Sequence, residues 1–265
     1  MINRASITQW RAQAPWNTNE QVEQDLIICR ALVAIFSDEF LASQLAFRGG
    51  TALHKLYLTP QSRYSEDIDL VQINPGPIKQ ILSRLGEVLD FLPGKVVKQK
   101  RYNNTLLFRM ESEIPPIVPI RLKIEINCFE HFNELGLLKV LFSIENNWFS
   151  GNSELTTYLL EELLGTKLRA LYQRKKGRDL FDLYKALTSA EVDIDLVIRC
   201  YKRYMEFVVS QPPTYKQFVQ NMENKMDDPD FWGDMENLIR SDLLQYDMQK
   251  AYRIVKDRII DKLIK

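Results

Sequence analysis

The sequence contains few of the residues that build zinc sites and disulfide frameworks. Its 265 residues include three cysteines, which lie far apart without a CxxC spacing, and two histidines. Because structural zinc is held by four histidine or cysteine side chains, we expect no zinc site. An odd number of scattered cysteines also predicts reduced thiols, as in a cytoplasmic protein.

Long apolar runs are missing as well. The most apolar segment, LIICRALVAIF at 26–36, is interrupted by Arg30, whereas a membrane-spanning helix needs about 18 apolar residues. The first 20 residues contain no apolar core of a signal peptide. We therefore expect a cytoplasmic protein without a membrane partner.

Neither sign of charge dominates, because 35 basic residues balance 35 acidic ones. A zero net charge excludes a chain that binds nucleic acid as a polycation, but it does not exclude a local basic surface. Between residues 95 and 123, basic residues are interleaved with Tyr102 and Phe108, as in a nucleic-acid track. A solvated sheet face is the simpler interpretation. The basic residues are Lys95, Lys98, Lys100, Arg101, Arg109, Arg121 and Lys123.

The pattern of apolar residues predicts an α/β (α+β) protein in two parts. Strands are expected at 45–48, at 67–73 and in four segments between 95 and 144, with a hairpin turn at Asn103-Asn104. Helices are expected after Thr18 or Asn19, at 51–58 and after Pro77. Only helices are expected farther on, near 156–174, 178–188, 194–210, 214–226, 230–240 and 247–264. We predict a domain at 1–150 with a small mixed sheet and flanking helices, and a helical bundle at 151–265.

Two acids in the segment DIDLVQI stand on one face of the expected strand. Successive strand side chains point to opposite faces, so Asp67 and Asp69 share a face while the residue between them can pack inward. The carboxylates would lie about 7 Å apart, where each disfavours ionisation of the other. Mg²⁺ removes this penalty, since it favours one or two carboxylates plus substrate phosphates. Taken alone, the pair could also be a solvated strand edge.

A glycine turn precedes these acids. Gly49, Gly50 and Thr51 lie between an expected strand and an expected helix. Glycine lets the backbone approach a ligand closely, and the N–H groups at a helix start attract anions. Thr51 can add a hydroxyl donor. A phosphate-binding turn followed by two metal-binding acids predicts a site for a nucleoside triphosphate, although an ordinary tight turn explains the glycines alone.

A third acid lies in the segment RLKIEINC. Its apolar residues alternate with polar ones, so Glu125 is expected on the polar face of a neighbouring strand. There it could complete a three-carboxylate set with Asp67 and Asp69. Metal ions held in this way clamp the attacking and leaving oxygens of a phosphoryl displacement. An exposed polar sheet face is the alternative.

The last motif is GTKLRALYQRKKGRDLFDL, at 165–183. Asp179 and Asp182 are three residues apart and therefore share a helix face. In one interpretation, Asp179 stabilises the first turn of its helix. In the other, Lys167 and Arg178 neutralise triphosphate charge, and Asp179 holds one of them in place.

Taken together, GGTALHKLY and RYSEDIDL, followed by KLRALYQR and RDLFDLYKAL, closely resemble the AbiEii/MenT family of nucleotidyltransferase toxins, within the DNA polymerase β-like superfamily. The resemblance covers roughly residues 30–190. It implies a nucleotidyltransferase core whose active-site cleft is completed by the helical domain.

The resemblance also assigns roles to individual residues. Gly50 and Thr51 match the glycine–serine element of the superfamily, and Asp67 and Asp69 match its metal-binding pair. Ser65 lies in the Arg-x-Ser-Glu-Asp run. Two further matches are Lys167, to the active-site lysine, and Asp179, to the aspartate of the Arg-Asp-x-x-Asp motif. Glu125 departs from the family pattern, in which the third acid is usually aspartate.

The function that the resemblance implies is a Mg²⁺-dependent toxin of a bacterial toxin–antitoxin or phage-defence system. It would transfer a nucleotide from an NTP to an RNA, with the tRNA 3′ end as the acceptor, and a cognate antitoxin would oppose it. Two alternatives stay open. One is a same-fold kinase or antibiotic nucleotidyltransferase, and the other is a non-catalytic module that binds nucleotide or RNA.

Overall fold

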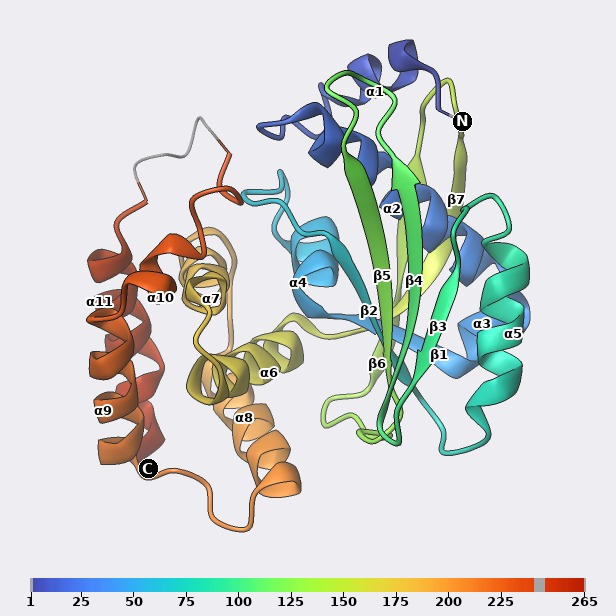
Figure 1. Ribbon diagram of the computed structural model, residues 1–265. Coiled ribbons are helices and arrows are strands. Elements are labelled where there is room, and N and C mark those ends of the chain that lie inside the picture. The colour runs from blue at the N-terminus through green and yellow to red at the C-terminus, as the bar shows by residue number, and fades with distance from the viewer. Residues whose placement is uncertain (1, 241–245, 265) are drawn as a thin grey trace. The chain divides into compact units, whose positions relative to one another are not determined.

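The computed structural model describes residues 2–240 and 246–264. The chain forms two compact units. The first consists of residues 1–56, 63–133 and 137–158, and the second of residues 57–62, 134–136 and 159–265. Figure 1 shows the strands in the first unit and helices alone at the C-terminal end of the chain. This arrangement confirms the predicted α/β class.

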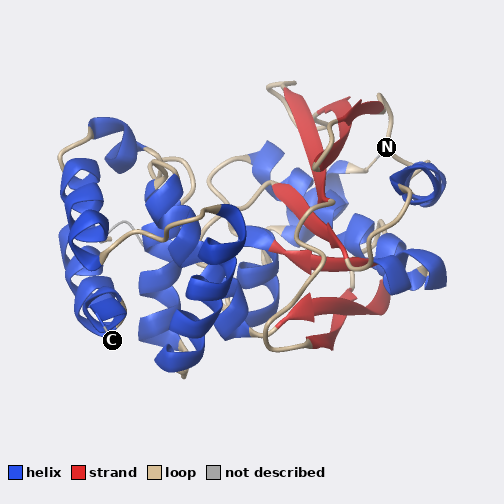
Figure 2. Ribbon diagram, turned by 90° about the horizontal axis from the view of Figure 1, so that it is seen from below, coloured by secondary structure: helices blue, strands red, loops and turns tan. Residues whose placement is uncertain are grey.

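In the described part of the chain, seven strands form one mixed sheet in the order β3-β4-β5-β2-β1-β7-β6 (Figure 2). β2 runs parallel to β5 and β1 parallel to β7, whereas the other neighbours are antiparallel. The strands are β1 (Leu45–Arg48), β2 (Asp67–Gln72), β3 (Val96–Gln99), β4 (Asn103–Glu111), β5 (Pro119–Asn127), β6 (Leu137–Ile144) and β7 (Gly151–Tyr158).

The two faces of the central strands differ in burial. On one face, Ile68, Leu122 and Ile124 are completely buried, and the long helix α2 (Asn19–Ser37) contacts β5, β6 and β7. On the other face, Asp67 and Asp69 are half-buried. The predicted alternation along β2 is therefore confirmed, since burial of the apolar residues points the two acids to the opposite face.

Side-chain caps mark the starts of three helices of the first unit. Thr18, one of the two expected N-caps, caps α2 in a capping box with Gln21. The helix expected to continue to residue 41 is interrupted, because the Asp38 side chain accepts a hydrogen bond from the Leu41 N–H and starts α3 (Glu39–Gln44). The remaining helices of this unit are α1 (Arg4–Trp10), α4 (Gly49–Ala52) and α5 (Ile78–Val88), and a π-helical turn (Leu53–Tyr57) follows α4.

Two local predictions were wrong. Asn103 and Asn104 do not form the hairpin turn but begin β4, where Asn104 pairs with Gln99. The turn lies at residues 100–102, closed by a hydrogen bond from the Lys100 N–H to the Asn103 carbonyl. Residues 156–158, where a helix was expected to begin, belong instead to β7. The pairing of β7 with β6 and β1 supplies hydrogen bonds that the sequence pattern alone does not reveal.

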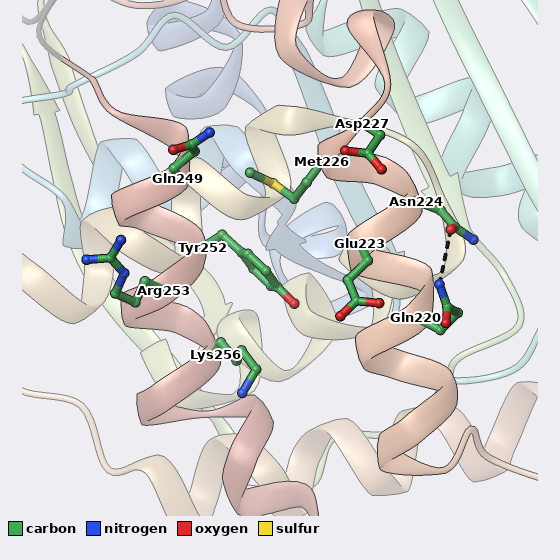
Figure 3. A pocket seen from close by; sticks show the side chains of 9 residues that line it. All are labelled: Gln220, Glu223, Asn224, Met226, Asp227, Gln249, Tyr252, Arg253 and Lys256. Carbon is green, nitrogen blue, oxygen red and sulfur yellow. Dashed lines mark hydrogen bonds between the residues drawn. The ribbon is translucent and has the colours of Figure 1, made fainter.

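The second unit is helical. Its helices are α6 (Leu160–Gln173), α7 (Gly177–Ser189), α8 (Ile194–Val208), α9 (Tyr215–Met226), α10 (Pro229–Gly233) and α11 (Met248–Arg258), and a 3₁₀ turn (Ile260–Ile264) follows α11. A cavity of about 640 Å³ lies between α9 and α11 (Figure 3). Tyr252 projects between these helices, and none of the predicted site residues lines the cavity. Among the described helices, none has the length and apolar character needed to cross a membrane.

A buried ionic cluster ties α2 to the π-helical turn. The Lys55 ammonium lies 2.9 Å from an Asp25 carboxylate oxygen and 3.2 Å from the Cys29 sulfur. The Trp10 indole donates to the other Asp25 oxygen at 3.0 Å. The side chains of Lys55 and Asp25 are only 2% and 1% exposed. Burial alone would lower the pKa of Lys55, but Asp25 and Cys29 raise it above its ordinary value, so the lysine stays charged.

Replacing Lys55 by methionine therefore leaves a buried carboxylate without its counter-charge. We expect Lys55→Met to lower the free energy of unfolding by about 3–5 kcal/mol, measured by urea denaturation. The matched control is Lys139→Met, which breaks the exposed ion pair with Glu154 and should cost less than about 1 kcal/mol. Equal stability of the two variants would contradict this account.

Candidate active site

The glycine turn and the paired acids meet in the structure. Gly49 follows β1 directly and has a positive φ of 82°. A Cβ atom added to Gly49 would lie 2.1 Å from an Asp69 carboxylate oxygen. Only glycine allows this approach, because any side chain would overlap the carboxylate. Two features that the sequence places 20 residues apart thus lie in contact.

The rest of the turn is held by the loop that precedes β2. A Cβ atom added to Gly50 would lie 2.5 Å from the Arg63 guanidinium and 3.2 Å from the Ser65 hydroxyl oxygen. Arg63 is 1% exposed, and its guanidinium donates to the Tyr64 carbonyl at 2.9 Å. The buried guanidinium therefore packs against the backbone of the turn from the protein interior.

Thr51 faces inward. It is 1% exposed, and its hydroxyl oxygen lies 2.5 Å from the Asp67 carbonyl oxygen and 2.8 Å from the Ser65 hydroxyl oxygen. The single hydroxyl proton can go to the carbonyl while the oxygen accepts from Ser65. In this state the hydroxyl connects the turn to the start of β2, and its role as an additional donor to a nucleotide stays a prediction.

Across the sheet, the acids of β2 lie beside polar residues of β5. Asp69 pairs in register with Glu125, and Asp67 pairs with Lys123. The Lys123 ammonium lies 2.8 Å from an Asp67 oxygen and 3.3 Å from a Glu125 oxygen. Lys123 was expected in the basic run and among the polar residues of this strand, without a role in the site. Its spacing of two residues from Glu125 was the available signal, because it puts both side chains on one face.

Burial and these contacts change the pKa values of Asp67 and Lys123. Burial raises the pKa of Asp67 above its ordinary value, and the negative charges of Glu66 and Glu125 add to the rise, while Lys123 opposes it. For Lys123, burial lowers the pKa, but its contacts with Asp67 and Glu125 outweigh burial and raise it. Lys123 is therefore charged at neutral pH and supplies positive charge to the carboxylates.

The donor set suits a hard cation. Asp67, Asp69 and Glu125 offer only carboxylate oxygens, which Mg²⁺ and Ca²⁺ prefer over nitrogen or sulfur. Within residues 2–240 and 246–264, however, no group of three histidine, cysteine or acidic side chains is assembled to hold a metal ion. The carboxylates therefore fit a Mg²⁺ ion that is bound by one or two of them and takes its other ligands from substrate phosphates. The role of Glu125 as a ligand stays a prediction.

A second group of predicted residues lies in the helical unit. The Lys167 ammonium is 3.1 Å from an Asp179 oxygen and 2.9 Å from an Asp182 oxygen. Both acids are completely buried, so they share one face of α7 as the spacing indicated. Arg174, which the sequence analysis did not assign, donates to both Asp179 oxygens at 2.6 and 2.7 Å.

Arg178 contacts Asp234, which is not one of the predicted site residues. Its guanidinium lies 3.7 Å from an Asp234 oxygen, and its backbone N–H donates to the same oxygen at 3.1 Å. We expected Asp179 to hold either Lys167 or Arg178, and the structure shows Lys167 in contact with it. The predicted site residues thus form two groups, one within each unit.

The chain matches one protein family in sequence and resembles several solved structures in fold. Residues 30–253 match the family described as "Nucleotidyl transferase AbiEii toxin, Type IV TA system". No curated protein matches the sequence. Among solved structures, the nucleotidyltransferase toxin MenT4 from Mycobacterium tuberculosis is 16% identical with a TM-score of 0.56, covering 96% of this chain and 99% of MenT4. JHP933 from Helicobacter pylori is 18% identical with a TM-score of 0.54, covering 94% of each chain. At these identities the structural likeness shows the fold.

The contact between Gly49 and Asp69 can be tested by adding a single methyl group. Gly49→Ala meets a left-handed backbone that costs about 1–2 kcal/mol and, in addition, the Asp69 carboxylate. Gly136→Ala is a matched control, because Gly136 has a φ of 88° and an added Cβ would meet nothing within 4 Å. We expect Gly49→Ala to reduce the free energy of unfolding more than Gly136→Ala, as measured by urea denaturation. Equal losses would mean that Asp69 does not lie against the turn.

Asp179 should make a pH-dependent contribution to stability. Burial alone would raise its pKa, but Lys167 and Arg174 outweigh burial and hold the pKa below 3.8. A carboxyl group whose pKa is lower in the folded than in the unfolded protein stabilises the fold at pH values above its unfolded pKa. This stabilisation is lost as the pH falls through the pKa of the folded protein. We expect Asp179→Asn to cost about 3–5 kcal/mol at pH 7. The difference from the wild type should shrink as the pH falls below 3.8, and a pH-independent difference in urea denaturation would contradict the ion pairs.

Proposed function

This chain belongs to the AbiEii nucleotidyltransferase toxin family of type IV toxin–antitoxin systems, and we propose that it transfers a nucleotidyl group from an NTP to an RNA hydroxyl. The acceptor in this proposal is the 3′ end of tRNA. The transfer would inhibit growth unless an antitoxin opposes it, and it would serve in defence against phage. The proposal places the protein in the cytoplasm, where its NTP and RNA substrates occur.

The observation that carries the proposal is the contact between the glycine turn and Asp69. It puts backbone N–H groups that can receive phosphate oxygens next to a carboxylate that can hold a cation. A nucleoside triphosphate needs both, because its charge is shared between a metal ion and amide donors. Ser65 lies beside the same turn, which supports its assignment to the nucleotide.

In the proposed reaction, the RNA hydroxyl oxygen attacks the α-phosphorus of the NTP. The bond from the α-phosphorus to the bridging oxygen breaks, and pyrophosphate leaves. One carboxylate of the set Asp67, Asp69 and Glu125 accepts the hydroxyl proton. Bound Mg²⁺ would neutralise charge on the phosphates, held by carboxylates of the same set.

The cations complete the proposed site. Lys123 already neutralises Asp67 and Glu125 and is free to turn toward phosphate oxygens once these acids hold a cation. Lys167 is assigned to the triphosphate, and Asp179 orients it through the 3.1 Å contact. Arg178 is assigned to the same charge. Each would act by electrostatic stabilisation of the transferred group.

The decisive assay incubates the purified protein with Mg²⁺, each labelled NTP and total tRNA. We expect label on tRNA for the wild type. Asp69→Ala should lower the transfer by at least about a hundredfold and abolish growth inhibition. The matched control is Glu154→Ala, which removes an acid that is 63% exposed on the edge hairpin and should leave transfer unchanged.

The other outcomes separate the alternatives. Label on protein in place of RNA would identify a kinase, and label on a small hydroxyl acceptor alone would identify an antibiotic-type nucleotidyltransferase. No label with any NTP, together with retained nucleotide or RNA binding, would identify a non-catalytic module. Full transfer by Asp69→Ala would overturn the assigned site.

A further inference from the structure

The polar face of the sheet extends beyond the acids onto β4 and β3. Residues paired in register across strands point to the same face. Asp69 pairs with Glu125, Glu125 with Thr105, and Thr105 with Lys98. Lys98 therefore shares the face of Asp69, about 14 Å away across three strand spacings. The edge strand β3 is exposed along its whole length.

Two arginines stand opposite each other on the same face. Arg109 of β4 pairs in register with Arg121 of β5, and Arg121 precedes Lys123 by two residues, or about 7 Å along the strand. Both arginines are exposed. Like charges directly opposite each other in a sheet are destabilising, so this pair weakens the isolated protein and would be relieved by an anion between the two guanidinium groups.

The basic side chains of this face are not neutralised internally. Among the residues that the structure describes, no acid forms an ion pair with Lys98, Arg109 or Arg121. Glu111, at the far end of β4, is the nearest acid to the arginine pair along that strand, and it too is exposed. The positive charge therefore stays available to a ligand.

Two exposed aromatic rings, tilted by 47° to each other, lie where β4 begins and β5 ends. Tyr102 and Phe129 are 43% and 36% exposed, and their ring centroids are 4.4 Å apart. The Arg101 guanidinium lies 5.0 Å from the Tyr102 ring centroid. The Cys128 N–H donates to the Tyr102 carbonyl at 2.8 Å, which fixes the turn to the end of β5. Exposed aromatic rings next to arginine are a stacking platform for nucleobases.

We propose that this basic face, made of Lys98, Arg109 and Arg121 with the platform of Tyr102 and Phe129, binds the single-stranded 3′ end of the acceptor RNA. The inference rests on the proposed transfer to RNA and deepens it by naming the surface that receives the acceptor. From Arg121 to Asn127 the face measures about 20 Å, with the acids between the arginine pair and the platform. Phosphates contact the cations, and an unpaired base stacks on Tyr102. Phe108, which the sequence analysis included in the track, is completely buried on the opposite face and takes no part.

Binding is measured without NTP, by fluorescence anisotropy of a labelled tRNA at several salt concentrations. For Arg109→Ala/Arg121→Ala we expect a loss of affinity on the order of tenfold and a salt slope that is smaller by about 1.4, because two phosphate contacts are lost. Arg109→Lys/Arg121→Lys keeps the charges and should retain most of the affinity. Because the like-charge pair is removed, the alanine variant should be at least as stable as the wild type in thermal unfolding.

The platform is tested separately. Tyr102→Ala should weaken binding by about 5- to 150-fold, as expected for one lost base stack, and leave the salt slope unchanged. The matched control is Lys79→Ala/Lys216→Ala, which removes one exposed cation of α5 and one of α9, both outside β3, β4 and β5; it should leave affinity and salt slope at the wild-type values.

The results distinguish this surface from the transfer reaction. Unchanged RNA binding by Arg109→Ala/Arg121→Ala overturns the surface, whether or not the wild type labels RNA. Weakened binding by that variant, with no labelling of RNA by the wild type, supports the surface and overturns the proposed transfer. Displacement of the tRNA by polyglutamate at equal charge concentration would show a general polyanion or acidic-protein surface and overturn the assignment to RNA.

Discussion

The architecture of the candidate site depends on the close approach between the Gly49 backbone and the Asp69 carboxylate. This contact fixes the distance between β1 and the acid-bearing strand β2 at the point where the chain turns into α4. It requires a residue without a side chain at a positive φ. The buried Arg63 and the inward hydroxyl of Thr51 contact the same turn, so side chains that do not reach solvent define the shape of the backbone proposed to bind phosphate.

A common electrostatic principle links the two groups of site residues. In each, a nearby cation opposes the rise in carboxylate pKa that burial causes. Lys123 opposes it in part for Asp67, whose pKa stays above its ordinary value, whereas Lys167 with Arg174 outweighs it for Asp179 in the helical unit. The sheet group is partly exposed and can exchange its cation, whereas Asp179 is fully buried. The first arrangement suits ligand binding, and the second suits the fixed orientation of a lysine.

Several structural features that depend on local sequence patterns were predicted correctly. The alternation in β2, the cap at Thr18 and the shared face of Asp179 and Asp182 all follow from strand or helix periods. The contact of Lys123 with Asp67 could not be predicted, because it depends on the parallel pairing of β2 with β5, more than 50 residues later. Strand β7 was missed for the same reason, since its hydrogen-bond partners are distant in sequence. The inward position of the Thr51 hydroxyl likewise depends on where the loop before β2 lies.

The pairing of β2 with β5 also sets how much of the chain must be synthesised before the acidic face of the sheet is complete. Domains form as the chain emerges from the ribosome, N-terminal part first. A nascent chain that ends before Pro119 contains the glycine turn and both aspartates of β2, but not the strand that brings Lys123 and Glu125 beside them. Translation products that end before Pro119 therefore lack the complete set of acids on this face.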